Sequence, residues 1–263
     1  MRDFVEIDWG GERVRIECER IHGASAANVV FLHEGLGSVS MWRDFPRRLC
    51  EAAGVCGIVF SRPGYGRSSL PASRRRRGPD YLHRQAYEVL PAFLEAAGLG
   101  EGRPAPWLFG HSDGGSIALL HAARFRARTA GIVVVAPHIF VEPVTIAGIE
   151  EARAAWATTG LRDRLARHHD DPEWVFRSWC DTWLDPRFRE WNIEHEIEAI
   201  RCPVLAVQGA RDEYGTLEQV RGIARRVAQA QLVELAGSGH SPQRDQPDAL
   251  IAAARGFIAS ARG

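Results

Sequence analysis

The feature that most constrains the fold is an alternation of short apolar segments with longer helical patterns. Each apolar segment is rich in β-branched residues, is bounded by Gly or Pro, and is hydrophobic almost without interruption. Such segments are typical of parallel strands that helices cover on both faces. The sequence places them at about 29–32, 55–60, 107–109, 132–135, 204–207 and 232–235.

Helical patterns separate these strands, and an N-terminal hairpin precedes them. Two segments, 2–8 and 12–19, meet at Gly10-Gly11 and are typical of antiparallel strands at a sheet edge. The sequence therefore predicts an α/β fold with a doubly wound, mostly parallel sheet of about eight strands. The helices are expected at about 40–53, 80–98, 114–127, 216–229 and 246–260.

One stretch, from 141 to 200, interrupts the alternation. No strand is predicted there, and it holds five of the eight tryptophans. Asp171-Pro172 predicts a helix start, after which Phe176, Trp179 and Trp183 share one helix face. That face either packs a small helical subdomain or roofs a pocket, and one face can do both.

The division of the chain follows from this interruption. We expect a core made of 1–140 and 201–263, with 141–200 inserted into it as a helical cap or lid.

Composition excludes several classes of protein. The 33 cationic and 33 acidic residues balance, which argues against a nucleic-acid binder that relies on overall positive charge. Every cationic residue is Arg, so chemistry that needs a lysine, such as a pyridoxal Schiff base or a Walker-A loop, is excluded.

Cysteine usage and hydropathy suggest the compartment. The five cysteines are scattered without a CxxC pair, which is typical of reduced thiols rather than of a disulfide framework or a zinc site. No signal peptide is recognisable, and no window approaches the roughly 20 apolar residues of a membrane span. We expect a cytoplasmic monomer or homodimer with a small-molecule substrate and with neither nucleic-acid nor membrane partners.

The strongest local motif is Gly-x-Ser-x-Gly at Gly110, Ser112 and Gly114. An apolar strand precedes it and a helical pattern follows, which is the context of a nucleophile elbow. Glycines are needed there because neighbouring side chains would clash with the backbone of a tight turn. The helix N-terminus would offer amide donors to a developing oxyanion. The motif predicts that Ser112 is a nucleophile.

A serine nucleophile needs a base and a residue that orients that base. His240 lies in a Gly-rich loop after the last strand, which could carry its imidazole to the carboxyl edge of the sheet. Asp212 follows the strand at 204–207, with Glu213 as a rival and Glu142 as a weaker one.

Three further histidines lie at strand ends. We expect structural or pocket-lining roles for them: His33, His111 and His138.

These motifs together resemble the α/β-hydrolase fold family along essentially the whole chain, within its capped esterase, thioesterase and C–C hydrolase branch. The chain order of nucleophile, acid and histidine is also that of the family. The resemblance implies an oxyanion hole formed by the backbone amides of Gly35 and Asp113, and neither a metal nor an organic cofactor. The segments that carry it are 33–38, 62–68, 110–115, 209–212 and 239–240.

Acidic and basic residues near these motifs depart from the usual pattern. Glu34 stands where the family usually has Gly. Its carboxylate is either solvated or bonded to an Arg of the neighbouring loop, or it faces the pocket and disfavours anionic substrates. The loop 62–77 carries six Arg, including Arg74 to Arg77, and is either solvated or attracts an anion. The acidic Asp113 has no explanation at this level.

The function predicted from these residues is that of a serine hydrolase. It would cleave an ester, thioester or related acyl bond of a small, largely apolar substrate through a Ser-His-Asp triad and an acyl-enzyme. A C–C bond hydrolase or a triad-based lyase is the nearest alternative, and a non-catalytic ligand-binding receptor is another. The expected substrate-pocket residues are Glu34, His138, Trp179 and Trp183.

Overall fold

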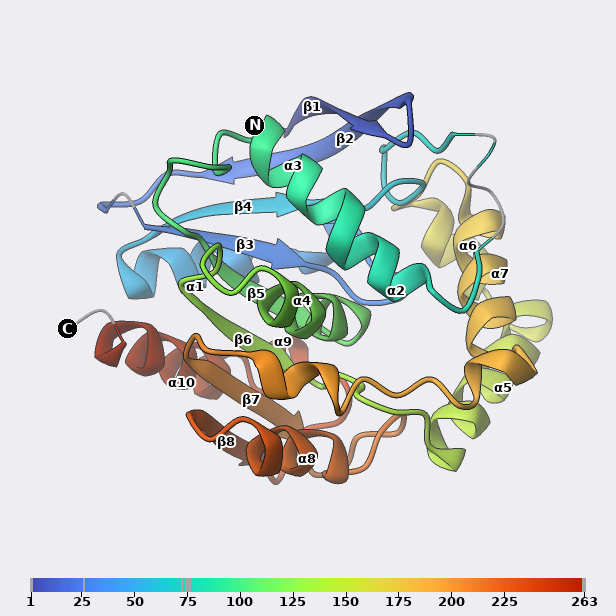
Figure 1. Ribbon diagram of the computed structural model, residues 1–263. Coiled ribbons are helices and arrows are strands. Elements are labelled where there is room, and N and C mark those ends of the chain that lie inside the picture. The colour runs from blue at the N-terminus through green and yellow to red at the C-terminus, as the bar shows by residue number, and fades with distance from the viewer. Residues whose placement is uncertain (1, 26, 72, 74–76, 262–263) are drawn as a thin grey trace.

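An eight-stranded, mostly parallel sheet runs through the computed structural model, which describes residues 2–25, 27–71, 73 and 77–261 (Figure 1). The strand order is β1-β2-β4-β3-β5-β6-β7-β8. β1 and β2 form the antiparallel hairpin, β2 pairs antiparallel with β4, and all other pairs are parallel. The predicted fold class is thus confirmed. The strands are β1 (Arg2–Trp9), β2 (Glu12–Ile21), β3 (Asn28–Leu32), β4 (Cys56–Phe60), β5 (Trp107–His111), β6 (Gly131–Val135), β7 (Val204–Gly209) and β8 (Ala230–Leu235).

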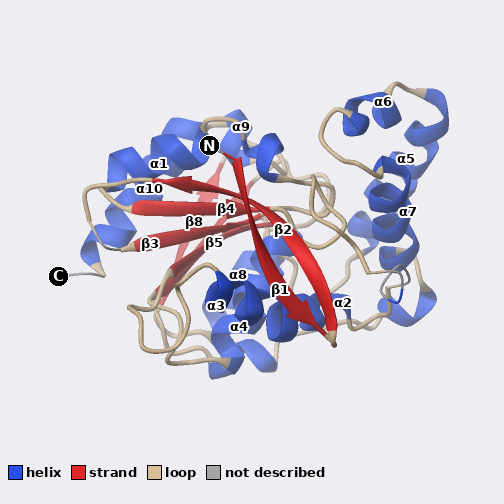
Figure 2. Cartoon of the chain, turned by 90° about the horizontal axis from the view of Figure 1, so that it is seen from above, coloured by secondary structure: helices blue, strands red, loops and turns tan. Residues whose placement is uncertain are grey.

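Helices cover both faces of the sheet, as Figure 2 shows. Every residue of β5, β6 and β7 is buried, which explains why these strands read as continuous apolar runs. One face carries α1 (Phe45–Ala53) and α10 (Pro247–Ser260), with the short α9 (Pro242–Asp245) before α10. The other face carries α2 (Tyr81–Arg84), a π-helical turn (Gln85–Val89), α3 (Leu90–Ala96), α4 (Asp113–Arg124) and α8 (Glu218–Arg226).

The helix predicted at 40–53 is in fact two elements. A 3-10 turn (Val39–Trp42) ends at Arg43, whose φ of 54° breaks the helical path, and α1 starts afterwards. Pro46 lies in the first turn of α1, where its missing amide and fixed φ are tolerated. The proline therefore marks a helix start that the apolar pattern alone did not show.

Three helices between β6 and β7 stand beyond the carboxyl ends of the parallel strands (Figure 2). They are α5 (Pro143–Thr158), α6 (Leu161–Ala166) and α7 (Pro172–Trp183). The side chain of Asp171 accepts a 2.9 Å hydrogen bond from the Trp174 amide and so caps α7 where the sequence predicted a start. Trp156 of α5 stacks on Phe176 of α7, with ring centres 4.1 Å apart.

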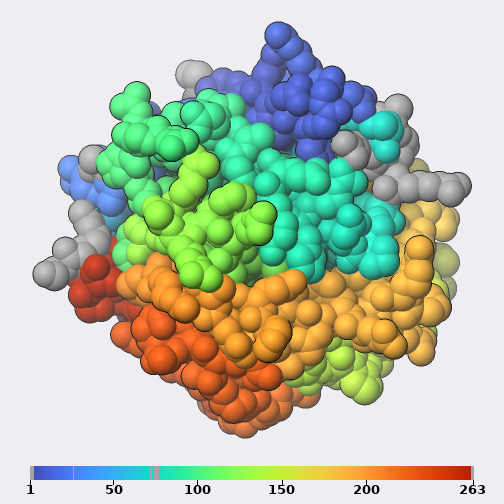
Figure 3. All heavy atoms as spheres, in the orientation of Figure 1, coloured from blue at the N-terminus to red at the C-terminus, as the bar shows by residue number. Residues whose placement is uncertain are grey.

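The chain then returns to the sheet along the outside of the molecule. Short 3-10 turns at Pro186–Phe188 and Glu196–Ala199 lie on this path, drawn in orange across the face in Figure 3. The second turn packs against α4 and α8 before β7 begins.

Polar contacts tie the inserted helices to loops at the carboxyl edge. The His169 ring accepts a hydrogen bond from the Gly66 amide at 2.9 Å, and its other nitrogen lies 2.9 Å from the Leu36 carbonyl oxygen. The Thr145 hydroxyl donates to the Tyr214 carbonyl at 2.6 Å. Since these loops follow β4, β3 and β7, the insertion rests on the ends of three strands. None of the described helices combines the length and apolarity needed to cross a membrane.

Candidate active site

Ser112 lies on a sharp turn between β5 and α4. Its φ of 53° is unusual for a residue with a side chain, and its amide donates a 2.9 Å hydrogen bond to the Val135 carbonyl at the end of β6. A Cβ at Gly110 would lie 2.2 Å from the Gly114 carbonyl oxygen, and one at Gly114 would lie 2.0 Å from the Leu32 carbonyl oxygen. Only glycine fits at either position, so the turn can form as the motif predicted.

A chain of hydrogen bonds joins Ser112, His240 and Asp212. The Ser112 Oγ lies 3.0 Å from His240 Nε2, and His240 Nδ1 lies 2.8 and 3.0 Å from the two carboxylate oxygens of Asp212. A carboxylate only accepts, so Nδ1 is the donor and Nε2 of the neutral ring is free to accept from the serine hydroxyl. The arrangement can withdraw a proton from Ser112 as its oxygen attacks.

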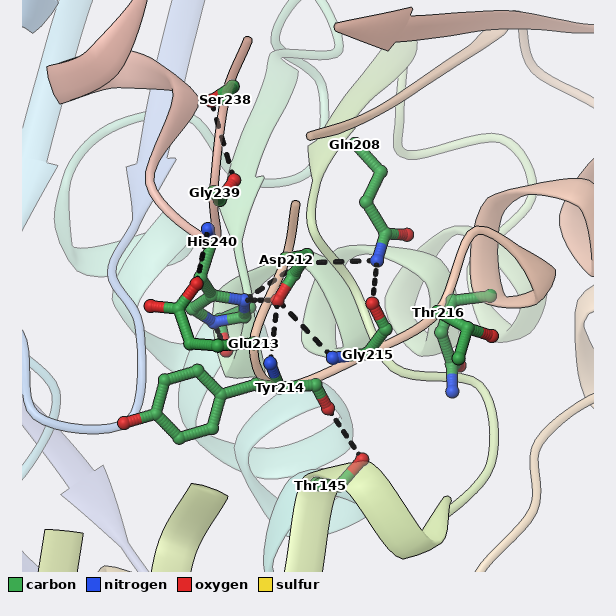
Figure 4. A network of polar contacts seen from close by, with 12 residues as sticks. Thr145, Gln208, Asp212, Glu213, Tyr214, Gly215, Thr216, Ser238, Gly239 and His240 are labelled. Carbon is green, nitrogen blue, oxygen red and sulfur yellow. Dashed lines mark hydrogen bonds and ion pairs between the residues drawn. The ribbon is translucent and has the colours of Figure 1, made fainter. Parts of the chain in front are cut away.

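The carboxylate of Asp212 is held by its own loop, as Figure 4 shows. It accepts from the amides of Tyr214 and Gly215 at 2.8 and 3.2 Å, and from Gln208 Nε2 at 3.1 Å. Burial pushes the pKa of Asp212 upward, but the hydrogen bond and positive charge of His240 outweigh it and leave this pKa below its ordinary value. Asp212 therefore stays ionised beside the imidazole.

The pKa of His240 is raised above its ordinary value of 6.5. Burial alone would lower it, yet the hydrogen bond and charge of Asp212, assisted by Glu34 and Glu213, outweigh burial. The His111 ring contacts the loop that carries His240. Burial lowers the pKa of His111 to about 3, and its neutral ring lies 2.7 Å from the His240 carbonyl oxygen. His240 is thus a basic imidazole on a fixed loop.

Neither rival acid touches the His240 ring. Glu213 accepts a 3.1 Å hydrogen bond from the His240 backbone amide instead. Glu142 accepts from the amide and hydroxyl of Thr216 at 2.9 and 2.6 Å. Of the three candidates, only Asp212 contacts the imidazole.

A cavity of about 260 Å³ opens beside Ser112 and His240. Its wall includes the four residues expected to line a pocket: Glu34, His138, Trp179 and Trp183. His138 is fully buried with its ring 5.0 Å from that of Trp183, and burial lowers the pKa of His138 to about 4, so it is neutral. Sequence analysis missed Tyr214, which also lines the cavity and whose ring lies 4.8 Å from the His240 ring, because nothing in the local pattern singles it out.

The two expected oxyanion donors border the same cavity. Gly35 follows β3 and Asp113 is the first residue of α4. Within the described part of the chain, neither backbone amide is engaged in a hydrogen bond. A Cβ at Gly35 would lie 2.4 Å from Trp179 Nε1, so glycine lets this loop approach the inserted helix α7.

Among the described residues, no arginine side chain pairs with the Glu34 carboxylate. It accepts a 2.7 Å hydrogen bond from the Leu36 amide and lines the cavity. Arg62 does reach Glu34, but it donates to the backbone carbonyl oxygen at 2.9 Å. Glu34 is half-buried and borders the cavity, as the pocket-facing alternative expects, and the partly exposed carboxylate remains accessible to solvent.

The arginines between 62 and 77 do not form one solvated run. Arg62 is 1% exposed and contacts Asp113 at 3.4 Å, which explains the acidic residue after Ser112. Arg77 lies over the rings of Tyr65, Tyr81 and Trp174. Arg74 to Arg76 lie outside the described residues.

No candidate metal centre is found among the described residues. No three of their His, Cys, Asp or Glu side chains come together in a way that could hold an ion. All five cysteines are free thiols.

The sequence model of the alpha/beta hydrolase family matches residues 29–254. Among solved structures, a thermophilic esterase from Thermogutta terrifontis is 18% identical with a TM-score of 0.76, and all of both chains is covered. An enol-lactonase from Burkholderia xenovorans LB400 is 19% identical with a TM-score of 0.75, and 97% of this chain and 99% of that chain are covered. A meta-cleavage product hydrolase from Pseudomonas fluorescens IP01 is 16% identical with a TM-score of 0.72, and 97% of each chain is covered. At these identities the likeness shows a common fold.

Replacing Gly114 by Ala tests the turn around Ser112. The added Cβ would meet the Leu32 carbonyl oxygen at 2.0 Å, so we expect the free energy of unfolding to fall by about 1–3 kcal/mol or more. The matched control is Gly256→Ala in α10, where a Cβ meets nothing within 4 Å. That change should be neutral or stabilise the protein by up to about 1 kcal/mol. Denaturant unfolding measures both, and equal effects would contradict the steric account.

Proposed function

Since this chain belongs to the alpha/beta hydrolase family, we propose that it is a serine hydrolase that cleaves an ester, thioester or related acyl bond. The observation that carries this proposal is the unbroken hydrogen-bonded series from Ser112 through His240 to Asp212 beside an open cavity. Acyl transfer by such a series requires a serine hydroxyl, a neutral imidazole and a carboxylate.

The proposed reaction has two halves. Ser112 Oγ attacks the carbonyl carbon while His240 Nε2 takes the hydroxyl proton, and Asp212 stabilises the imidazolium that results. His240 then gives this proton to the departing alcohol or thiol, which leaves an acyl-enzyme on Ser112. His240 then deprotonates a water molecule that attacks the acyl carbon. The bond between this carbon and Ser112 Oγ breaks, the imidazolium returns the proton to Oγ, and the carboxylic acid leaves.

The oxyanion formed in each half would be stabilised by the amides of Gly35 and Asp113. The Asp113 amide lies at the N-terminus of α4, where the helix dipole adds positive potential. Both residues border the cavity beside Ser112. Each such donor typically contributes about 10²- to 10³-fold to the rate.

The inserted helices α5, α6 and α7 act in this proposal as a cap over the cavity. They supply apolar and aromatic walls, among them Ile149, Leu165, Trp179 and Trp183. A cavity of about 260 Å³ with these walls suits a small, largely apolar acyl group. The Glu34 carboxylate in the same wall would repel an anionic substrate.

The first prediction concerns the nucleophile. Ser112→Ala should abolish both covalent labelling by a fluorophosphonate and turnover of p-nitrophenyl esters and phenyl thioesters, because no other group in the series can attack. The control is Ser260→Ala, at the end of α10 and remote from the cavity in sequence and element, which should label and turn over like the wild type. Labelling is read on a denaturing gel and turnover by absorbance.

Other results of that experiment identify the alternatives. If the folded wild type labels at Ser112 but releases no product from any ester or thioester, analysis of products from C–C bonded substrates separates a C–C hydrolase or lyase from an esterase. A folded wild type that neither labels nor turns over contradicts catalysis. Stabilisation of that protein by small apolar ligands would then point to a receptor.

The second prediction concerns pH. His240 acts as a base only when neutral, so kcat/KM should fall on acidification through a pKa above 6.5. Asp212→Asn removes the charge that raises this pKa, so the acid limb should move to lower pH. The rate itself should fall on the order of 10⁴-fold, since the amide no longer stabilises the imidazolium. Rate–pH profiles of both proteins measure this, and an acid limb that stays in place would contradict the role of Asp212.

The third prediction concerns substrate charge. Glu34→Gln removes one negative charge from the cavity wall and should raise kcat/KM for an ester with an anionic acyl group relative to its neutral analogue. A gain of about 5- to 10-fold, or roughly 1–1.4 kcal/mol, is expected for one partly exposed charge. Succinate monoesters and butyrate esters form a suitable pair. An unchanged ratio would mean that the bound acyl group lies away from Glu34.

A further inference from the structure

The two amides assigned to the oxyanion hole lie on loops from different strands. Gly35 follows β3 and Asp113 follows β5. An oxyanion benefits from two donors only when their separation is fixed, and a displacement of about 1 Å can cost on the order of 10²-fold in rate. The two loops therefore need a link that holds them together.

Arg62, the second residue after β4, contacts both loops. Its Nη2 donates to the Glu34 carbonyl oxygen at 2.9 Å, one residue before Gly35. Nη1 and Nη2 lie 3.5 and 3.4 Å from Asp113 Oδ2. Both side chains of this ion pair are almost completely buried, at 2% and 1% exposed.

Further contacts fix the guanidinium between these loops. The Arg62 backbone amide donates to His33 Nε2 at 3.0 Å, so the neutral His33 ring carries its proton on Nδ1, which donates to the Glu34 carbonyl at 2.7 Å. Burial and the Arg62 charge keep the pKa of His33 well below its ordinary value, which preserves this tautomer. The carbonyl of the peptide joining Glu34 to Gly35 thus accepts from Arg62 and His33, and also from the Gly37 amide at 3.1 Å.

A second group also holds the Asp113 carboxylate. The Tyr81 hydroxyl donates to Asp113 Oδ2 at 2.8 Å, and its oxygen in turn accepts from Trp183 Nε1 at 2.8 Å. Trp183 belongs to the inserted helix α7 and lines the cavity. The network therefore runs from the inserted helix α7 to Asp113, the residue that follows Ser112.

A purely stabilising role explains this network poorly. A buried ion pair loses most of its Coulomb energy to desolvation, and apolar residues of similar volume are often as stable. Apolar packing could not fix a backbone carbonyl and a carboxylate at a set separation. A planar guanidinium does so, because several of its N–H groups donate at once. We propose that Arg62 is a positioning residue that sets the distance between the oxyanion-binding amides of Gly35 and Asp113. This inference rests on the proposed function.

Arg62→Lys tests this role while keeping a positive charge beside Asp113. A lysine ammonium carries its three N–H donors on one nitrogen and lacks the planar fork that spans both loops. We expect kcat for a p-nitrophenyl ester to fall about 10- to 100-fold with KM changed by less than about 3-fold. Arg20→Lys is the control, since Arg20 also directs two N–H groups at one carbonyl, that of Ala97, but far from β5 in the sheet order. It should retain the wild-type kcat.

Inhibitors separate positioning from loss of structure. A boronic acid that forms a tetrahedral adduct with Ser112 should lose affinity for Arg62→Lys in proportion to kcat/KM, whereas the carboxylic acid product should bind as it does to the wild type. The melting temperature of each variant is measured by circular dichroism, and all assays are performed well below it. A folded Arg62→Lys enzyme with kcat within 2-fold of wild type overturns the proposal, and so does an equal loss of affinity for both inhibitors.

Tyr81→Phe decides the question if Arg62→Lys does not fold. It keeps the ring and removes only the hydroxyl that donates to Asp113. A several-fold fall in kcat with unchanged product affinity supports the network, and unchanged kcat overturns it. Wild-type turnover that depends on Ser112 is measured beside every variant. If that turnover is absent, the proposed function and this inference fail together; if it is present and the variants behave as wild type, only the inference fails.

Discussion

The backbone turn at Ser112 is the constraint on which the rest of the site depends. It forms because Gly110 and Gly114 leave room for carbonyl oxygens at distances that no Cβ would allow. The turn brings the serine hydroxyl out at the carboxyl edge and starts α4 immediately below it. It also directs the next side chain, Asp113, into the interior. A buried carboxylate requires a cationic or hydrogen-bonding partner, so Arg62 and Tyr81 follow from the same turn.

Much of the fold could be predicted because the central strands are buried on both faces. Every residue of β5, β6 and β7 is buried, so no side chain on these strands faces solvent. Continuous apolar runs in the sequence are the direct consequence. The break at Arg43 escaped prediction because the apolar spacing of 40–53 suits one helix as well as a turn followed by a helix. The positive φ of Arg43 decides between the two, and apolar periodicity contains no information about φ.

The candidate site was predictable where a residue lies close after a strand end, as Asp212 does after β7, because parallel strands bring their ends to one edge. His240 required only one more step, a Gly-rich loop long enough to reach that edge. Arg62 was misread because it begins a stretch rich in arginine, where composition favours solvation. Its ion pair with Asp113 joins the segments that follow β4 and β5, and a single sequence does not reveal such a long-range contact.

The inserted helices leave the sheet after β6 and rejoin it at β7. They contact the loops that follow β3, β4 and β7, and Trp183 of α7 also donates to Tyr81 of α2. They therefore occupy a single gap in the connectivity of the sheet. The segment between β6 and β7 can differ in length or sequence without a change in the order of the strands or in the turn at Ser112. Trp183 of α7 both lines the cavity and donates to the Tyr81 hydroxyl that holds Asp113, so a substitution there changes the wall of the cavity and the support of Asp113 together.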